Sequence, residues 1–298
     1  MNDMEENPIL IAGVFDGHGG NAASTTASQL LPSLVSAQLA ASKFTPNKNS
    51  EKLTHAFQSA WETTCQTYQG GCNDEDGACV ADYDPVEGII MGHVGSQDLV
   101  AGTTASVILL KTRKDDGDQL SASKDKEEDD FIIVLNCGDS RTLLFQGPSR
   151  EKESSSVVQF CTRDHSPKDE KEGLRLKQGK DQGLDYSLPE CSSSRWWLTI
   201  GDYQYAVSRS LEGEFAFSKG IVYDADVTMI PLSSNEERII MIASDGVFEV
   251  MDNEEVGRDL LSMRDAGICA GDAAKNICGA ALDKGTSDNV SVVIIYLS

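Results

Sequence analysis

Residues 14–20 (VFDGHGG) bring together two side chains that could do chemistry. An apolar run over 9–15 ends at Asp16, and the glycines that surround His18 let the backbone turn sharply. A carboxylate at the end of a buried strand can hold a hard cation, and an imidazole can move a proton. Alone the segment is a weak signal, because Asp-Gly turns end many ordinary strands.

Three further aspartates share this placement at the end of an apolar run. Asp139 and Asp245 each follow such a run within two residues, and Asp288 precedes the run 290–297. If these strands lie side by side, the carboxylates gather at one end of a sheet, where their repulsion is costly unless cations lie between them. Oxygen ligands suit Mg²⁺ or Mn²⁺ rather than zinc, and two such ions can clamp a phosphoryl group.

The elements that must position these carboxylates are mostly strands. Apolar and β-branched runs predict strands over 9–15, 103–111, 131–137, 141–145, 157–162, 203–208, 238–243 and 290–297. Helical spacing or a capping residue predicts helices over 21–42 with a kink or restart at Pro32, over 50–68, from Asp252 to 263, and after a cap at Asp272. Because strands and helices cluster rather than alternate, we expect an α+β fold with mostly antiparallel sheets.

We expect one domain over residues 1–298, because no Pro-rich linker and no internal repeat divides the sequence. The segment 113–130 is rich in acids without periodicity, which predicts a disordered acidic excursion. Residues 163–200 are irregular, which predicts a flap-like insertion. The glycine-rich, acidic residues 70–88 predict a loop whose spacing fails the EF-hand pattern.

The formal charge of −23 argues against a nucleic-acid partner, because phosphates would be repelled. No apolar run reaches the roughly 18 residues of a membrane span, and residues 1–6 lack the features of a signal peptide. We therefore expect a cytoplasmic and/or nuclear monomer with no membrane partner. The eight cysteines include no Cys-x-x-Cys pair, so free thiols are expected rather than zinc or redox sites.

Seven short segments, in this order, resemble the metal-dependent protein serine/threonine phosphatases of the type 2C (PPM) family. They are 13–20 (GVFDGHGG), 102–105 (GTTA), 136–141 (NCGDSR), 162–165 (TRDH), 206–211 (AVSRSL), 243–246 (ASDG) and 287–290 (SDNV). Each is weak alone, whereas the ordered set is highly specific. The resemblance implies a four-layer α/β/β/α sandwich of two mostly antiparallel sheets flanked by helices.

The resemblance further implies a phosphoric monoester hydrolase that removes phosphate from phosphoserine and phosphothreonine in phosphoprotein substrates by metal-activated water. Its cofactors would be two Mg²⁺ or Mn²⁺ ions, with a third, weaker one. Asp16 resembles the carboxylate that bridges two metals, with the Gly17 carbonyl on the second. Asp245 and Asp288 resemble ligands of the first metal.

The remaining roles are implied in the same way. Asp139 and Glu249 match positions linked to the third metal. His18 matches the general acid that protonates the leaving oxygen, although a histidine merely hydrogen-bonded at a turn would give the same pattern. The positions of Arg141, Arg163, His165 and Arg209 match residues with a structural role.

The chain departs from the family pattern in three places. The family opens with a strand that carries a phosphate-binding arginine and a Met-Glu-Asp motif, and residues 1–15 contain no arginine, so this strand is expected to be missing. Residues 211–213 (LEG) replace Leu-Gly-Asp, and Glu249 replaces an aspartate. A fragment, a misplaced start and a true pseudoenzyme are all compatible with the first departure.

Two other functions compete with the phosphatase. One is a catalytically impaired or inactive phosphatase-fold protein that acts as a regulatory or binding module. The other is a metal-dependent nuclease or other phosphodiesterase, which the charge of −23 and the lack of a basic groove disfavour.

Overall fold

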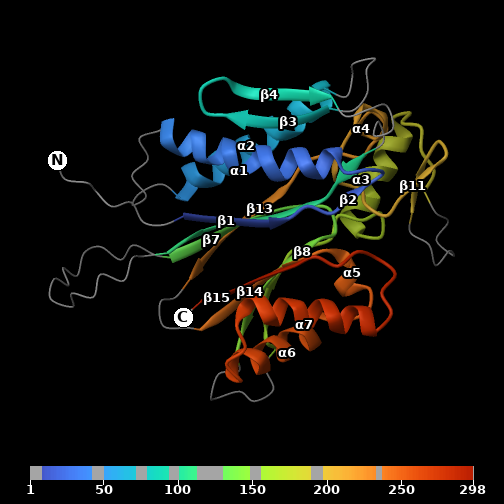
Figure 1. Cartoon of the computed structure of the whole chain (residues 1–298). Helices are drawn as coiled ribbons and strands as arrows, with labels where there is room; N and C mark the ends of the chain where they lie inside the picture. The colour runs from blue at the N-terminus through green and yellow to red at the C-terminus, as the bar shows by residue number, and fades with distance from the viewer. Residues whose placement is uncertain are drawn as a thin grey trace, which may run out of the picture.

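The computed structural model describes residues 9–41, 50–71, 79–93, 101–112, 130–147, 156–188, 197–232 and 237–297. Within these ranges strands and helices occur in clusters along the chain rather than in strict alternation (Figure 1). Every pairing between two named strands is antiparallel. The predicted α+β fold with mostly antiparallel sheets is therefore confirmed.

The first large sheet has the strand order β1-β6-β7-β13. Its strands are β1 (Ile9–Val14), β6 (Ala105–Lys111), β7 (Asp130–Cys137) and β13 (Asp226–Leu232). All of β6 and nearly all of β7 are buried, which explains why both read as continuous apolar runs. β13 is absent from the predicted strands, because Pro231 and exposed alternate residues hide the pattern of an edge strand.

The second large sheet has the strand order β15-β14-β8-β9. Its strands are β8 (Arg141–Gln146), β9 (Val158–Cys161), β14 (Arg238–Ala243) and β15 (Val292–Leu297). The turn 138–140 leads directly from β7 into β8, so the chain passes between the two sheets at one end of both.

Helix pairs cover the outer faces of the two sheets (Figure 1). α1 (Ala22–Ala41) and α2 (Ser50–Gly71) lie on the first sheet, and α6 (Asn253–Asp265) and α7 (Ala270–Asp283) lie on the second. The alternation of β6 shows both contacts: Val107 and Leu109 pack in the core under α1 and α2, whereas Ile108 and Leu110 pack toward the second sheet. The core between the sheets consists of Val14, Ile108, Leu110, Ile132, Val134, Leu144, Ile240 and Ile242.

The helix predictions agree with the structure in extent and differ at one cap. α1 is continuous through Pro32, so this proline does not restart the helix. The Asp252 side chain accepts from the Glu255 amide at 2.8 Å, which confirms the predicted cap of α6. α7 begins after Cys269, so Asp272 lies in its first turn rather than at its cap. None of the described helices is both long enough and apolar enough to cross a membrane.

A hairpin occupies part of the range predicted as a loop. β3 (Cys79–Asp84) and β4 (Gly88–His93) pair with each other and lie on the outer side of α1 and α2 (Figure 1). The buried Ala81 donates its amide to Thr26 Oγ1 of α1 at 3.1 Å. The loop prediction is wrong here because a two-stranded ribbon needs few apolar residues when a helix pair already provides the core.

The segment 163–200, predicted as irregular, contains α3 (Glu170–Asp181) and β10 (Leu198–Ile200). Together with β11 (Tyr203–Tyr205) and α4 (Glu214–Phe217), these elements enclose a separate small core. That core, here called the flap core, consists of Leu176, Tyr186, Leu198, Ile200, Tyr205, Ala216 and Ile221. α3 buries only two side chains, which explains the missing periodicity. Residues 113–129 of the predicted acidic excursion lie outside the described residues.

Replacement of two helical glycines by alanine should change the stability of the fold in opposite directions. A Cβ at Gly257 in α6 would lie 2.6 Å from Phe145 Cδ1 and 2.7 Å from Val157 Cγ2, whereas one at Gly279 in α7 would meet nothing within 4 Å. We expect Gly257→Ala to destabilise the fold by about 1–2 kcal/mol, because overpacking exceeds the gain in helix propensity. We expect Gly279→Ala to stabilise it by about 0.5–1 kcal/mol.

Urea unfolding of the two variants measures this difference. Equal free energies of unfolding for Gly257→Ala and Gly279→Ala would show that α6 does not pack against β8 as described.

Candidate active site

The strand register brings Asp16 and Asp139 to the same end of the first sheet. β1 and β7 both pair with β6, and Val14 and Asn136 lie on either side of Ser106. Because both strands run antiparallel to β6, they run parallel to each other and end at the same edge. Asp16 and Asp139 each follow the last residue of their strand by two positions.

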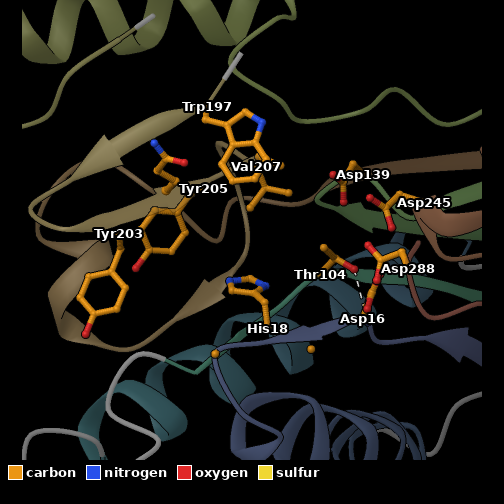
Figure 2. A pocket seen from close by; sticks show the side chains of 14 residues that line it. Asp16, His18, Thr104, Asp139, Trp197, Tyr203, Tyr205, Val207, Asp245 and Asp288 are labelled. Atoms are coloured by element: carbon orange, nitrogen blue, oxygen red, sulfur yellow. Dashed lines mark hydrogen bonds between the residues drawn. The ribbon is translucent and has the colours of Figure 1, made fainter. Parts of the chain in front are cut away.

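The second sheet brings Asp245 and Asp288 to that edge as well. The C-terminal end of β14 pairs with the N-terminal end of β15, with Ala243 opposite Val292. Asp245 follows β14 and begins the short helix α5 (Asp245–Phe248), and Asp288 precedes β15. Figure 2 shows the four aspartates side by side, on the opposite side of the site from an aromatic wall. The structure therefore confirms that these four strand-end carboxylates converge.

A cavity of about 320 Å³ opens at this convergence. Six of the seven predicted site residues line it, namely Asp16, Gly17, His18, Asp139, Asp245 and Asp288. The seventh, Glu249, has a carboxylate oxygen within 4.8 Å of carboxylate oxygens of Asp245 and Asp288. The predicted residues thus occupy one site.

The donor set of this site fits a hard divalent cation. Asp245, Glu249 and Asp288 offer three carboxylate oxygens that all lie within 4.8 Å of one another. Asp245 Oδ1 is buried and has no hydrogen-bond partner in the described part of the chain. A buried oxygen without a donor is costly, and a cation would satisfy it.

Burial and repulsion from neighbouring acids raise the pKa of Asp245, Asp139 and Asp16. Burial, followed by the charges of Asp139, Asp16 and Asp288, raises the pKa of Asp245 to about 8. Burial and the charge of Asp164 raise the pKa of Asp139 to about 6. The pKa of Asp16 is raised mainly by burial and then by the charge of Asp288. Without cations, the site therefore binds protons in their place.

Thr104 connects the turns that carry two of the acids. Its amide donates to Asp16 O at 2.9 Å, the Asp16 amide donates to its Oγ1 at 3.4 Å, and this Oγ1 also lies 2.8 Å from Ser140 Oγ. Gly138 has φ +114°, and a Cβ there would lie 2.5 Å from Thr104 Cβ. The Gly138 amide donates to His165 Nδ1 at 3.2 Å, which agrees with the structural role implied for His165.

The three arginines implied to be structural each pair with a carboxylate of the protein. Arg141 donates to both oxygens of Asp164, at 2.8 and 2.7 Å. Arg209 donates to the buried Glu172 at 2.5 and 2.9 Å, and Arg163 pairs with Asp169. None of the three belongs to the described lining of the cavity.

His18 lies between the carboxylates and the aromatic wall (Figure 2). Its Nε2 is 2.6 Å from Glu212 Oε1, and the two side chains are 35% and 1% exposed. Burial lowers the pKa of His18, but the charge and hydrogen bond of Glu212, together with the charges of Asp139 and Asp16, outweigh this effect, so the pKa lies above its ordinary value of 6.5. His18 therefore lines the cavity while its Nε2 is hydrogen-bonded to the buried Glu212. The sequence identified Glu212 only as a departure from the family pattern.

The aromatic wall consists of Trp197, Tyr203 and Tyr205 (Figure 2). Trp197 and Tyr203 are each 46% exposed, and Tyr203 packs edge-on against Phe215 at 5.5 Å between ring centroids. Large exposed aromatic side chains beside a polar cavity offer apolar surface to a bound ligand. No motif in the sequence indicated these residues: Trp197 lies in the irregular segment 163–200, and Tyr203 and Tyr205 lie in the predicted strand 203–208, where their aromatic character was the available signal.

Comparison with known proteins gives a consistent family. The model of the family "Protein phosphatase 2C" matches residues 1–290. Protein phosphatase 1B of Bos taurus is 29% identical over 172 residues, and protein phosphatase 2C 16 of Arabidopsis thaliana is 31% identical over 184 residues. Each match covers 56% of this chain and 32% of the relative, so the chain spans about a third of the length of these relatives.

A solved structure extends the comparison to the fold. The crystal structure of serine-threonine phosphatase 2C from Toxoplasma gondii has a TM-score of 0.67 at 16% identity, and the match covers 100% of this chain and 87% of that one. A structure of a C. elegans sex-determining protein also has a TM-score of 0.67, at 20% identity, covering 99% and 58% of the two chains. With the matched family model and the convergent carboxylates, the chain belongs to the protein phosphatase 2C family.

Proposed function

We propose that this chain is a metal-dependent protein serine/threonine phosphatase that acts on phosphoprotein substrates. The observation that carries the proposal is the convergence of Asp16, Asp245 and Asp288 with the imidazole of His18 in one cavity. Phosphoryl transfer needs charge stabilisation at phosphorus and a proton for the leaving oxygen, and this cavity offers groups for both. Two packed sheets between two helix pairs support the four-layer α/β/β/α sandwich as the scaffold.

The acids would hold two Mg²⁺ or Mn²⁺ ions. Asp16 and the Gly17 carbonyl lie on the first sheet's side, and Asp245 and Asp288 lie on the second sheet's side. Such ions, when bound, supply polarisation of the phosphoryl oxygens and a nucleophile at neutral pH. A third, weaker ion would be held near Asp139 and Glu249, two acids whose distance from Asp245 is short enough to raise its pKa.

His18 would protonate the leaving serine or threonine oxygen. An alkoxide is a poor leaving group, so a positioned acid accelerates its departure by about 10²–10⁴-fold. Because Nε2 is hydrogen-bonded to Glu212, Nδ1 is the ring nitrogen that can donate a proton to the substrate. The phosphate would lie among the carboxylates, and the peptide would lie between His18 and the aromatic wall.

Phosphate release from a phosphothreonine peptide tests the proposal. We expect phosphate release in Mn²⁺ and none in EDTA. We expect Asp245→Asn to lower the rate by more than about 100-fold, because removal of a metal ligand lowers activity more than removal of a residue that only orients a ligand. Asp259→Asn is the matched control, because it removes the same charge from an exposed position on α6.

Release that survives both EDTA and Asp245→Asn would contradict the proposal. A folded, cation-loaded chain that releases no phosphate would favour the regulatory or binding module instead.

The raised pKa of Asp245 also predicts how stability depends on pH without metal. A carboxyl whose pKa rises from 3.8 to about 8 on folding favours the folded state below its unfolded pKa, and this contribution is lost as the pH rises through about 8. In EDTA, we therefore expect Asp245→Asn to melt at least about 3 °C above the wild type at about pH 8.5, with a smaller gap toward about pH 5.

Addition of Mg²⁺ should raise the melting temperature of the wild type more than that of Asp245→Asn. A variant that is less stable than the wild type at every pH in EDTA would show that the Asp245 carboxylate stabilises the fold by itself.

A further inference from the structure

Three very short strands bring His18 and Glu212 to opposite sides of one glycine. β2 (Gly17–His18), β5 (Gly102–Thr103) and β12 (Leu211–Glu212) form a sheet with β5 in the middle. In its register, Gly102 lies opposite His18 on one side and opposite Glu212 on the other.

The missing side chain at Gly102 lets the outer two residues meet. Neighbouring strands lie about 4.8 Å apart, so residues on the outer strands are roughly 10 Å apart at their backbones. A Cβ at Gly102 would lie 2.3 Å from each carboxylate oxygen of Glu212, which shows that the carboxylate occupies this space. From there, Glu212 Oε1 reaches to 2.6 Å from His18 Nε2.

The environment of Glu212 differs from that of Glu172, the other buried glutamate among the described residues. Glu172 is also 1% exposed, but Arg175 and Arg209 both pair with it, which explains its burial by stability alone. Glu212 receives a hydrogen bond from Ser210 Oγ at 2.5 Å, and among the described residues its ion-pair partner is His18. Its Oε2 is buried without a hydrogen-bond partner in the same part of the chain. A buried carboxylate so weakly compensated costs stability, and a functional constraint on His18 accounts for that cost.

We propose that Glu212 is a positioning residue, which fixes the imidazole of His18 so that Nδ1 faces the leaving oxygen of the substrate. This inference rests on the proposed phosphatase function. In the step concerned, the water oxygen forms a bond to phosphorus, the bond from phosphorus to the substrate oxygen breaks, and the proton on Nδ1 moves to the departing oxygen. One proton of the water then replaces the proton lost by His18, and the other stays with the phosphate.

Two substrates with different leaving groups separate this role from a structural one. The leaving group of a phosphothreonine peptide is an alkoxide that needs a proton, whereas the leaving group of p-nitrophenyl phosphate is a stable phenolate that does not. We expect Glu212→Gln to lower kcat on the peptide by at least about 30-fold with little change in KM, and to lower kcat on p-nitrophenyl phosphate by less than about 3-fold. The amide keeps the volume of the side chain but carries no charge and can turn its NH₂ group toward Nε2, so it no longer holds Nε2–H as a donor and no longer fixes the orientation of the ring.

Two further variants complete the experiment. Ser210→Ala is the control, because it removes the other hydrogen bond to the same Glu212 oxygen and should leave the ratio of the two substrates within about 3-fold. In a His18→Gln background, Glu212→Gln should add no further loss on the peptide, because it acts through His18.

An equal loss on both substrates, or a full additional loss in the His18→Gln background, would overturn the positioning role while leaving the phosphatase intact. A wild-type chain that hydrolyses neither substrate would overturn the proposed function, and this inference with it.

Discussion

Repulsion among carboxylates at one edge of two sheets is the constraint around which this molecule is built. The strands that deliver Asp16, Asp139, Asp245 and Asp288 are packed in apolar surroundings, so the acids cannot move apart without breaking the sheets. Burial raises the pKa of Asp16, Asp139 and Asp245, and Asp245 Oδ1 lacks any donor among the described residues. Protons or divalent cations are therefore the means by which the fold can close over this site.

The rigid scaffold holds the repelling carboxylates at fixed positions. The sheets meet at the turn 138–140, and Thr104 binds this turn to the backbone of Asp16. Separations between the acids are thereby set by strand register rather than by loops. A site whose ligands are fixed in this way needs little structural reorganisation to bind an ion or a phosphoryl group.

The carboxylates were predictable because each lies at the end of an apolar strand: Asp16, Asp139 and Asp245 follow β1, β7 and β14, and Asp288 precedes β15. Such a run has a clear end, and the residue type at that end is visible in the sequence. The ordered motifs then indicated the family, and the antiparallel α+β fold followed from the clustering of strands. The same logic could not find α3, which buries only Glu172 and Leu176, or β13, whose edge position and Pro231 remove the usual pattern.

The environment of His18 shows a second limit of prediction from sequence. β2, β5 and β12 have two residues each, which is too short for any periodicity. Glu212 lies 194 positions from His18 along the chain and meets it only because Gly102 leaves the space between them. A contact that forms over a glycine between residues far apart in the sequence leaves no pattern in the neighbouring residues. Glu212 was therefore visible in the sequence only as a departure from the family pattern.

The flap core has a consequence for how this protein can change. Tyr205 of the aromatic wall and the neighbouring Leu198 pack with α3 and α4 in a cluster that shares no buried residue with the cores of the two large sheets. Substitutions inside the flap core and substitutions inside the cores of the two large sheets therefore have no buried residue in common, and their effects on stability should add. Selection could thus vary the flap core that supports the aromatic wall while the sheets that carry the acids stay unchanged, so that the two regions evolve with little epistasis between them.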